Sequence, residues 1–377
     1  MLTGVATRFD LLCGPCAELP APELIDACVG CFDCTEVLAH LGWRGAPEIL
    51  LRDRELAGAW ATRPCPVRPL NDRCLAPHPE GWLALTEAGF VRIDDEDQWL
   101  LGPVVLPEER DVERNDGPDR PRGPVLHVPD DGRFAAIVSD YGQYGTVVDL
   151  AEWVTVLDLD RDWDDNEWTR FPFAFLDGDR FVAATDSNRL DVFEAATGRL
   201  LTERSTTRED NPEHYLGYCF GAMLPSPSGR SLLTDGWAWH PVGIPLVIDC
   251  AAWLAGDRHA PEHGRHLVDR GAAWDTPMAW LNENTVALQG IGVPLLDGIE
   301  LRDATTGHHI GSFAGPKGRM WAHDGLLYVA AEAGLGVWDP AEGARIGLLE
   351  GFAPIAHREG TFAELRNDQL RTWATPR

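Results

Sequence analysis

The residues whose type and spacing best suit chemistry are the cysteines near the start of the chain. Seven of the nine cysteines lie between Cys13 and Cys74. Two C-x-x-C pairs, Cys13/Cys16 and Cys28/Cys31, are separated by eleven residues. That spacing can supply four thiolates to a tetrahedral zinc ion. One expectation is therefore a structural zinc site at Cys13, Cys16, Cys28 and Cys31.

Two other interpretations of these cysteines stay open. The range Pro22–Trp43 carries Cys28 and Cys31 among apolar residues at helical spacing, so both thiols could be buried as small hydrophobic groups in an amphipathic helix. Cys13-Gly14-Pro15-Cys16 also has the letters of a redox motif, which needs a thiolate of lowered pKa. Only twelve residues precede it, too few for the strand and helix that a thioredoxin requires. An odd cysteine count without a signal peptide favours a reducing compartment.

Two matched segments carry aromatic residues that suit a binding surface. Each has a strand, an acidic residue, an aromatic-rich loop and a second strand that closes on Asp-x-Ala-x-Trp. Tyr and Trp bury large areas at small entropic cost, as interfaces and pockets require. The candidate binding residues are Asp140, Tyr141, Tyr144, Asp235, Trp237, Trp239 and His240. The alternative is that Trp237 and Trp239 pack between neighbouring sheets.

Charge excludes some classes of partner. The formal net charge is −28, so the surface repels nucleic-acid phosphates and anionic membranes. No segment approaches the roughly 18 apolar residues of a membrane span. We therefore expect a cytoplasmic protein that binds neither nucleic acid nor membrane. A basic protein partner would complement the charge, and salt would weaken its binding.

Known catalytic signatures are missing from the sequence. There is no G-x-S-x-G elbow, no Walker-type phosphate loop and no H-E-x-x-H helix. Asp158–Glu167 is rich in carboxylates but lacks the glycine and the final glutamate of an EF-hand loop. The sequence alone therefore favours binding over catalysis.

The elements that must position these residues are short strands in a repeating unit. Three segments, Leu190–Leu201, Ile299–Ile310 and Leu335–Ile346, each place an apolar strand before an acidic residue, a glycine four positions later and a second strand. This pattern predicts a β-hairpin. Gly307 and Gly343 of the last two hairpins stand 36 residues apart. A period near 40 with strand-turn-strand content indicates a propeller.

We therefore expect an all-β, seven-bladed β-propeller after a short, Cys-rich and partly helical N-terminal segment. The segment should comprise residues 1–47 and the propeller residues 48–377. The expected blades are Cys74–Leu106, Pro124–Pro172, Phe173–Ser205, Tyr215–Arg270, Ala273–Gly315, Lys317–Gly351 and Phe352–Arg377. The last has only three strands, so an N-terminal strand should close the ring, because an unpaired edge exposes ladder donors and acceptors. Glu48–Val67 is the first choice for it and Val5–Leu12 the second.

The hairpins G-V-W-D-P-A-E-G (Gly336–Gly343) and L-R-D-A-T-T-G (Leu301–Gly307) resemble the strand c, turn and strand d portion of bacterial WD-repeat β-propellers. The resemblance implies a rigid, non-catalytic scaffold that binds a protein partner, without a cofactor beyond the possible zinc. The same residues also resemble the D-x-x-T-G-x-x-x-W repeat of quinoprotein dehydrogenases, although the terminal Trp is missing. The alternative is therefore a propeller enzyme, hydrolase or quinoprotein-type, with a small-molecule site at the central opening. Convergent carboxylates in a deep pocket would favour the enzyme. A shallow, aromatic and acidic face would favour the scaffold.

Overall fold

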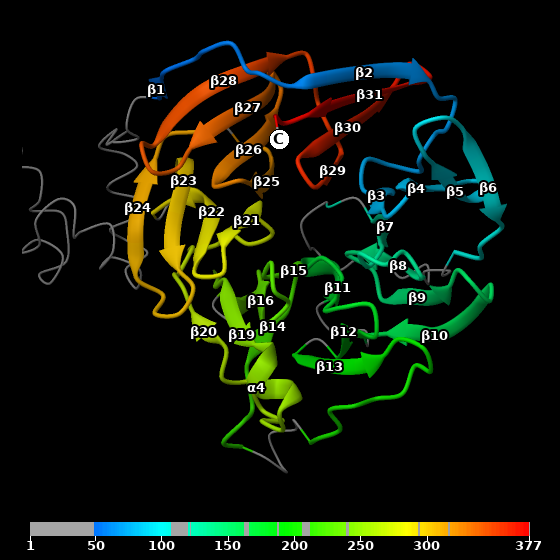
Figure 1. Ribbon diagram of the computed structural model, residues 1–377. Coiled ribbons are helices and arrows are strands. Elements are labelled where there is room, and N and C mark those ends of the chain that lie inside the picture. The colour runs from blue at the N-terminus through cyan, green and yellow to red at the C-terminus, as the bar shows by residue number, and fades with distance from the viewer. Residues whose placement is uncertain are drawn as a thin grey trace, which may run out of the picture.

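The chain forms a ring of small antiparallel sheets, with the first strand of each sheet nearest the centre (Figure 1). The computed structural model describes residues 49–106, 120, 122–161, 166–186, 188–205, 212–238, 241–292, 295–315 and 317–376. The prediction of an all-β propeller of the WD-repeat-like type is confirmed. Residues 1–48 fall outside the described ranges, and with them the Cys-rich segment, its proposed zinc ligands and the alternative closing strand.

The sheets follow one another along the chain. The first contains β3 (Leu75–His78), β4 (Gly81–Thr86), β5 (Gly89–Ile93) and β6 (Gln98–Gly102). The second contains β7 (Gly123–His127), β8 (Phe134–Asp140), β9 (Tyr144–Asp149) and β10 (Val154–Asp160). The 3-10 helix η3 (Asn166–Trp168) precedes the third, which contains β11 (Phe173–Phe175), β12 (Arg180–Asp186) and β13 (Arg189–Glu194). The fourth contains β15 (Met223–Pro225), β16 (Ser231–Thr234), β19 (Leu246–Asp249) and β20 (Arg265–His266), with helix α4 (Cys250–Leu254) after β19.

The remaining sheets complete the ring. The fifth contains β21 (Met278–Asn282), β22 (Thr285–Ile291), β23 (Leu296–Asp303) and β24 (His309–Phe313). The sixth contains β25 (Arg319–His323), β26 (Leu326–Ala331), β27 (Gly334–Asp339) and β28 (Ala344–Glu350), with β1 (Leu50–Leu51) parallel to β28. The seventh contains β29 (Ala356–Arg358), β30 (Thr361–Arg366) and β31 (Gln369–Ala374). A small extra sheet, β14 (Tyr218–Cys219), β17 (Trp237–Ala238) and β18 (Val242–Gly243), includes the loop between β16 and β19. The number of seven blades stays a prediction, since the sheets are those of the described residues alone.

A strand from the N-terminal side completes the seventh sheet. β2 (Ala59–Pro64) pairs antiparallel with β31, from Ala59 opposite Ala374 to Pro64 opposite Gln369. Figure 1 shows the two strands side by side. The strand lies within Glu48–Val67, the range from which we expected it. The pairing gives the backbone groups of β31 a partner and joins the two ends of the propeller.

The second and third repeated segments form the outer hairpins of their sheets. In the first, the turn after β13 is followed by a single bridge, between Phe193 and Leu200, and the expected second strand does not form. Gly198, Gly307 and Gly343 have φ values of 66°, 77° and 62°, which favour glycine. In the second repeat, the Gly307 N–H donates to the Asp303 carbonyl at 2.8 Å. The Asp303 carboxylate accepts from the Thr306 N–H at 2.7 Å. Acidic residue and glycine thus form the turn together, as the spacing predicted.

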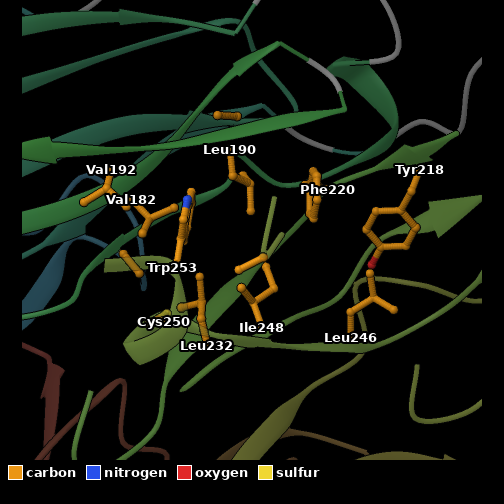
Figure 2. Packing of buried hydrophobic residues seen from close by; sticks show 13 residues of the cluster. Val182, Leu190, Val192, Tyr218, Phe220, Leu232, Leu246, Ile248, Cys250 and Trp253 are labelled. Atoms are coloured by element: carbon orange, nitrogen blue, oxygen red, sulfur yellow. The ribbon is translucent and has the colours of Figure 1, made fainter. Parts of the chain in front are cut away.

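The core lies between neighbouring sheets, where alternate residues of each strand face the next sheet. Figure 2 shows one cluster, in which Val182 and Leu190 of the third sheet pack with Leu232 and Ile248 of the fourth. Trp253 of α4, 2% exposed, belongs to the same cluster. Within the described residues, no helix has the length and apolarity to cross a membrane.

The Asp-x-Ala-x-Trp motif serves this packing. The Asp249 carboxylate caps α4 by accepting from the Ala252 N–H at 2.8 Å. Asp149 likewise accepts from the Ala151 N–H at 2.9 Å. The capped turn directs Trp253 into the core, as Figure 2 shows. The matched pattern in the two segments therefore marks packing tryptophans at its end, and any binding role belongs to the loops before it.

Candidate functional site

The antiparallel order of the strands gives the ring two faces. The turns within the first and last hairpins of each sheet lie on one side, which we call the turn face. The loops between the second and third strands lie on the other side with the connections between sheets, and we call this the connection face. Because the first strands are innermost, the residues just before them converge at the centre of the connection face.

A cavity of about 750 Å³ lies at this centre. Its charged and aromatic lining consists of five arginines, three aspartates, a tyrosine and a tryptophan: Arg73, Arg120, Arg122, Arg170, Arg319, Asp72, Asp140, Asp275, Tyr141 and Trp274. We call it the arginine cavity. Its basic centre departs from the acidic face that we associated with a scaffold, in a chain whose net charge is −28.

Two of the aspartates form ion pairs across the cavity. Asp140 pairs with Arg73, and the Phe171 N–H donates to its second oxygen at 3.2 Å. Asp275 pairs with Arg120. Both carboxylates are nearly buried, with 7% and 4% of their side chains exposed. These pairs connect segments that are far apart in the sequence and hold the connections of different sheets together.

The other arginines bond to neutral groups or stand near an existing pair. Arg122 Nε donates to the Tyr141 carbonyl at 3.1 Å, and Arg319 donates to the Asp72 carbonyl at 2.9 Å. Arg170 Nε lies 4.0 Å from the Asp140 carboxylate. Carbonyls leave the guanidinium charge in place, so the cavity keeps an excess of positive charge.

Burial shifts the pKa values of several groups at this site. Burial and the charges of Arg170 and Arg319 lower the pKa of Arg73 to about 9. Burial raises the pKa of Asp275 despite the nearby arginines. Behind the cavity, burial and the Asp275 charge raise the pKa of Asp235 to about 7. Burial is the largest cause of each of these shifts.

Aromatic rings join the two loops that the sequence had matched. The Arg120 guanidinium lies 5.4 Å from the centre of the Tyr141 ring and 5.5 Å from that of Trp274. Trp274 stacks on Trp237 at 5.6 Å, and its Nε1 donates to the Trp168 carbonyl at 2.7 Å. Arg120 and Trp274 thus connect the loop of the second sheet with the loop of the fourth.

The structure brings some of the candidate binding residues to the cavity. Asp140 and Tyr141 line it, whereas Asp235 and Trp237 lie behind it. The Asp235 carboxylate accepts from the Thr276 N–H at 2.8 Å and is 1% exposed. Tyr144 begins β9 opposite Asp160 and is not among the residues that line the cavity. Trp239 and His240 fall outside the described residues.

Two residues of the cavity hold a backbone conformation that side chains disfavour. Tyr141 and Asp275 both have φ of 58°, in the left-handed region. Such conformations cost of order 1–3 kcal/mol each and persist where surrounding contacts enforce them, which is common at functional sites. At Tyr141, the carbonyl bond from Arg122 contributes to that constraint.

Sequence reasoning missed the arginines and Trp274. Their common signal is position: Arg73, Arg122 and Arg170 each stand one to three residues before the first strand of a sheet, and Arg319 is the first residue of one. A search for charged residues directly before innermost strands would have found them. Without the strand order, an arginine beside a proline or aspartate looks like an ordinary loop residue.

A second depression of about 610 Å³ extends from the arginine cavity between the seventh and first sheets. Asn71 and Asp72 line both spaces. Val67, Ile355 and Leu365 form its apolar part. We call this depression the radial groove. The connection face therefore combines a charged centre with a partly apolar extension.

The described residues contain no group of three or more His, Cys, Asp or Glu side chains arranged to hold a metal ion. The cysteines among them, Cys65, Cys74, Cys219 and Cys250, are free thiols. Because Cys13, Cys16, Cys28 and Cys31 lie outside the described residues, the zinc site stays a prediction.

Comparison with known proteins shows the fold. The chain is similar to a chain in the crystal structure of the mitotic checkpoint complex, at 10% identity and a TM-score of 0.53, over 87% of this chain and 93% of that one. BamB from Moraxella catarrhalis is similar at 12% identity, with a TM-score of 0.46, over 85% of this chain and 100% of BamB. The Cps50 (Swd1) β-propeller domain from Myceliophteria thermophila is similar at 12% identity, with a TM-score of 0.45, over 85% and 98%. No protein-family model matches the sequence, and neither does any curated protein.

Proposed function

We propose that this WD-repeat-like β-propeller is a non-catalytic scaffold in the cytoplasm, which binds a protein partner across its connection face. The observation that carries the proposal is the continuity of the arginine cavity with the radial groove through Asn71 and Asp72. An extended segment of a partner can occupy both spaces. Arg, Tyr and Trp are also the residues enriched at interface hot spots.

The state of the cavity carboxylates supports a scaffold over a hydrolase. Hydrolysis by a carboxylate pair needs one acid that can donate a proton and one base that can accept it. Asp140 and Asp275 each form an ion pair with an arginine, Arg73 and Arg120. One oxygen of each carboxylate thus lies in an ion pair with a guanidinium.

The acidic chain as a whole and the basic cavity favour partner groups of opposite charge. The net charge of −28 led us to expect a basic partner, and that prediction rests on the charge of the chain as a whole. The centre of the connection face has the opposite sign. A partner that contacts both the acidic surface and the arginine cavity would present basic residues to the surface and a group of different chemistry to the cavity.

Affinity purification with face-specific variants tests the proposal. Tyr141→Ala/Trp274→Ala removes both aromatic walls of the cavity, and we expect it to lose the partner that the wild-type chain recovers from its own cells. Asp130→Ala/Ser228→Ala is the matched control on the turn face and should recover that partner at wild-type yield. Tyr141→Ala alone covers the case in which the double variant melts early. Equal yields from the cavity variants and the control would reject the proposal.

A further inference from the structure

We infer that the arginine cavity binds a single oxyanion group, a carboxylate or a phosphate carried by a side chain of the partner, while the radial groove holds the neighbouring residues. The inference rests on the proposed function and adds the chemistry of the group that is recognised. Five guanidinium groups and three carboxylates line the cavity. One anion would reduce the remaining positive charge.

Arg170 is the residue best placed to receive it. Its Nε has no hydrogen-bond partner among the described residues, and the nearest carboxylate oxygen, of Asp140, lies 4.0 Å away. Its side chain lines the cavity and is 27% exposed, with the unpartnered Nε at its buried side. A guanidinium presents a planar fork of donors that matches the two oxygens of a carboxylate or phosphate.

The surroundings strengthen this interaction. Arg73 and Arg319 lie close enough to Arg170 for their charges to affect one another. Low-dielectric walls of Tyr141 and Trp274 concentrate the field in a concave site. Burying like charges together is unfavourable in the empty cavity, and an oxyanion relieves that repulsion. The cavity is therefore more complementary to an anion than to a neutral or cationic group.

The charge pattern beyond the cavity favours a peptide over a nucleic acid. A nucleic-acid strand needs positive charge along its whole path. The radial groove instead carries charges of both signs, including Asp72 and the pair between Arg68 and Asp368, whose atoms are 3.0 Å apart. A peptide with one anionic side chain in the arginine cavity and neutral or apolar residues in the radial groove fits both spaces.

A set of capped synthetic peptides tests the inference on the full chain. Three otherwise identical random libraries carry phosphoserine, glutamate or glutamine at a fixed central position, and their binding to the immobilised protein is compared. We expect phosphoserine or glutamate to bind about tenfold or more tightly than glutamine, as charge-assisted hydrogen bonds imply. The preference between the first two distinguishes a phosphate from a carboxylate source.

Two variants, each of which removes one arginine charge, complete the peptide-binding experiment. Arg170→Gln should weaken the oxyanion libraries about tenfold or more. Arg199→Gln removes an exposed arginine from a turn of the third sheet and should leave them unchanged. Thermal melts of both variants confirm folding, and competition by inorganic phosphate on the wild-type chain gives a readout that needs no variant.

Several results would overturn the inference. Equal binding of the glutamine library, no binding of either oxyanion library, or full binding by Arg170→Gln would each do so, as would tighter binding of a single-stranded oligonucleotide of matched charge. If glutamine peptides bind equally and Tyr141→Ala abolishes that binding, the proposed function stands while the oxyanion inference fails. The two claims are thus tested separately.

Discussion

The two faces of the ring have depressions of similar size and opposite chemistry. The arginine cavity of the connection face has about 750 Å³, and a depression on the turn face has about 720 Å³. The lining of the latter includes Asp130, Asp131 and Asp177 together with turn prolines and glycines. Size alone therefore does not distinguish them. The difference lies in how far apart in sequence the interacting residues are.

On the turn face, Asp131 and Asp177 bond within their own turns, and one carboxylate, that of Glu283, reaches Ser228 of the neighbouring sheet. Asp131 accepts from the Arg133 N–H at 3.0 Å and Asp177 from the Asp179 N–H at 2.9 Å. These contacts form during the folding of a single hairpin. On the connection face, Arg73 pairs with Asp140 of another sheet. Asp131 and Asp177 are thus held within single turns, whereas Asp140 is held by a contact that exists only in the closed ring.

Removing one carboxylate from each face should show the largest contrast. Asp140→Ala leaves Arg73 and the Phe171 N–H without their acceptor, and we expect it to lower the free energy of unfolding by about 2–3 kcal/mol. Asp131→Ala loses one turn bond and should cost about 0.5–1 kcal/mol. Urea denaturation of both variants measures the difference. Equal losses would contradict the proposed contrast between the faces.

The pH dependence of stability should differ in sign between the faces. The folded-state pKa of Asp235 is about 7 against an ordinary value of 3.8, so its contribution is present at low pH and is lost as pH rises through about 7. Burial opposes ionisation of Asp177 too, but its bonds to Arg180 and the Asp179 N–H lower its pKa, so its contribution is lost as pH falls. Asp235→Asn should remove a slope of at most about 1.4 kcal/mol per pH unit between pH 4 and pH 7.

Denaturation at several pH values across this window checks that prediction, with Asp177→Asn as the control that removes the slope of opposite sign. An Asp235→Asn variant with the same pH profile as the wild type would show that this carboxyl titrates normally.

Exchanges between glycine and alanine at Tyr141 and Gly132 should each change the free energy of unfolding by about 1 kcal/mol, because both positions have a positive φ. At Tyr141, φ is 58°, so Tyr141→Gly should be more stable than Tyr141→Ala by about 1 kcal/mol, because both lack the ring and only alanine bears the strain. At Gly132, φ is 68°, and an added Cβ would lie 2.6 Å from Pro79 Cδ, so Gly132→Ala should lose about 1 kcal/mol or more. Thermal melts report both. An alanine at Tyr141 that equals glycine would mean that the loop is unstrained.

Much of the local structure could be predicted from the sequence, whereas most of the site could not. The turns at Gly198 and Gly307 follow from short-range rules that relate an acidic residue to a glycine four positions on. The closing strand follows from a missing edge partner. Asp140 and Tyr141 were found because two similar loops carried the same pattern of residue types.

The arginines were missed for a physical reason. Arg73 and Arg170 come together in the cavity only when the connections of different sheets converge, and no local pattern records that convergence. Tyr144 shows the converse: its residue type suits a pocket, but it begins β9 opposite Asp160 of the outermost strand and does not line the cavity. Its role in binding stays a prediction. Residue type predicts what a side chain can do, whereas strand order decides where it lies.

Hydrogen–deuterium exchange on the full chain, alone and with the partner that affinity purification recovers, tests whether the partner binds the connection face. We expect slower exchange on binding in residues 70–74, 140–142 and 273–276 of the connection face. Exchange in residues 129–132 and 226–229 of the turn face should stay unchanged. Protection confined to the turn-face segments would contradict the assignment of the binding surface.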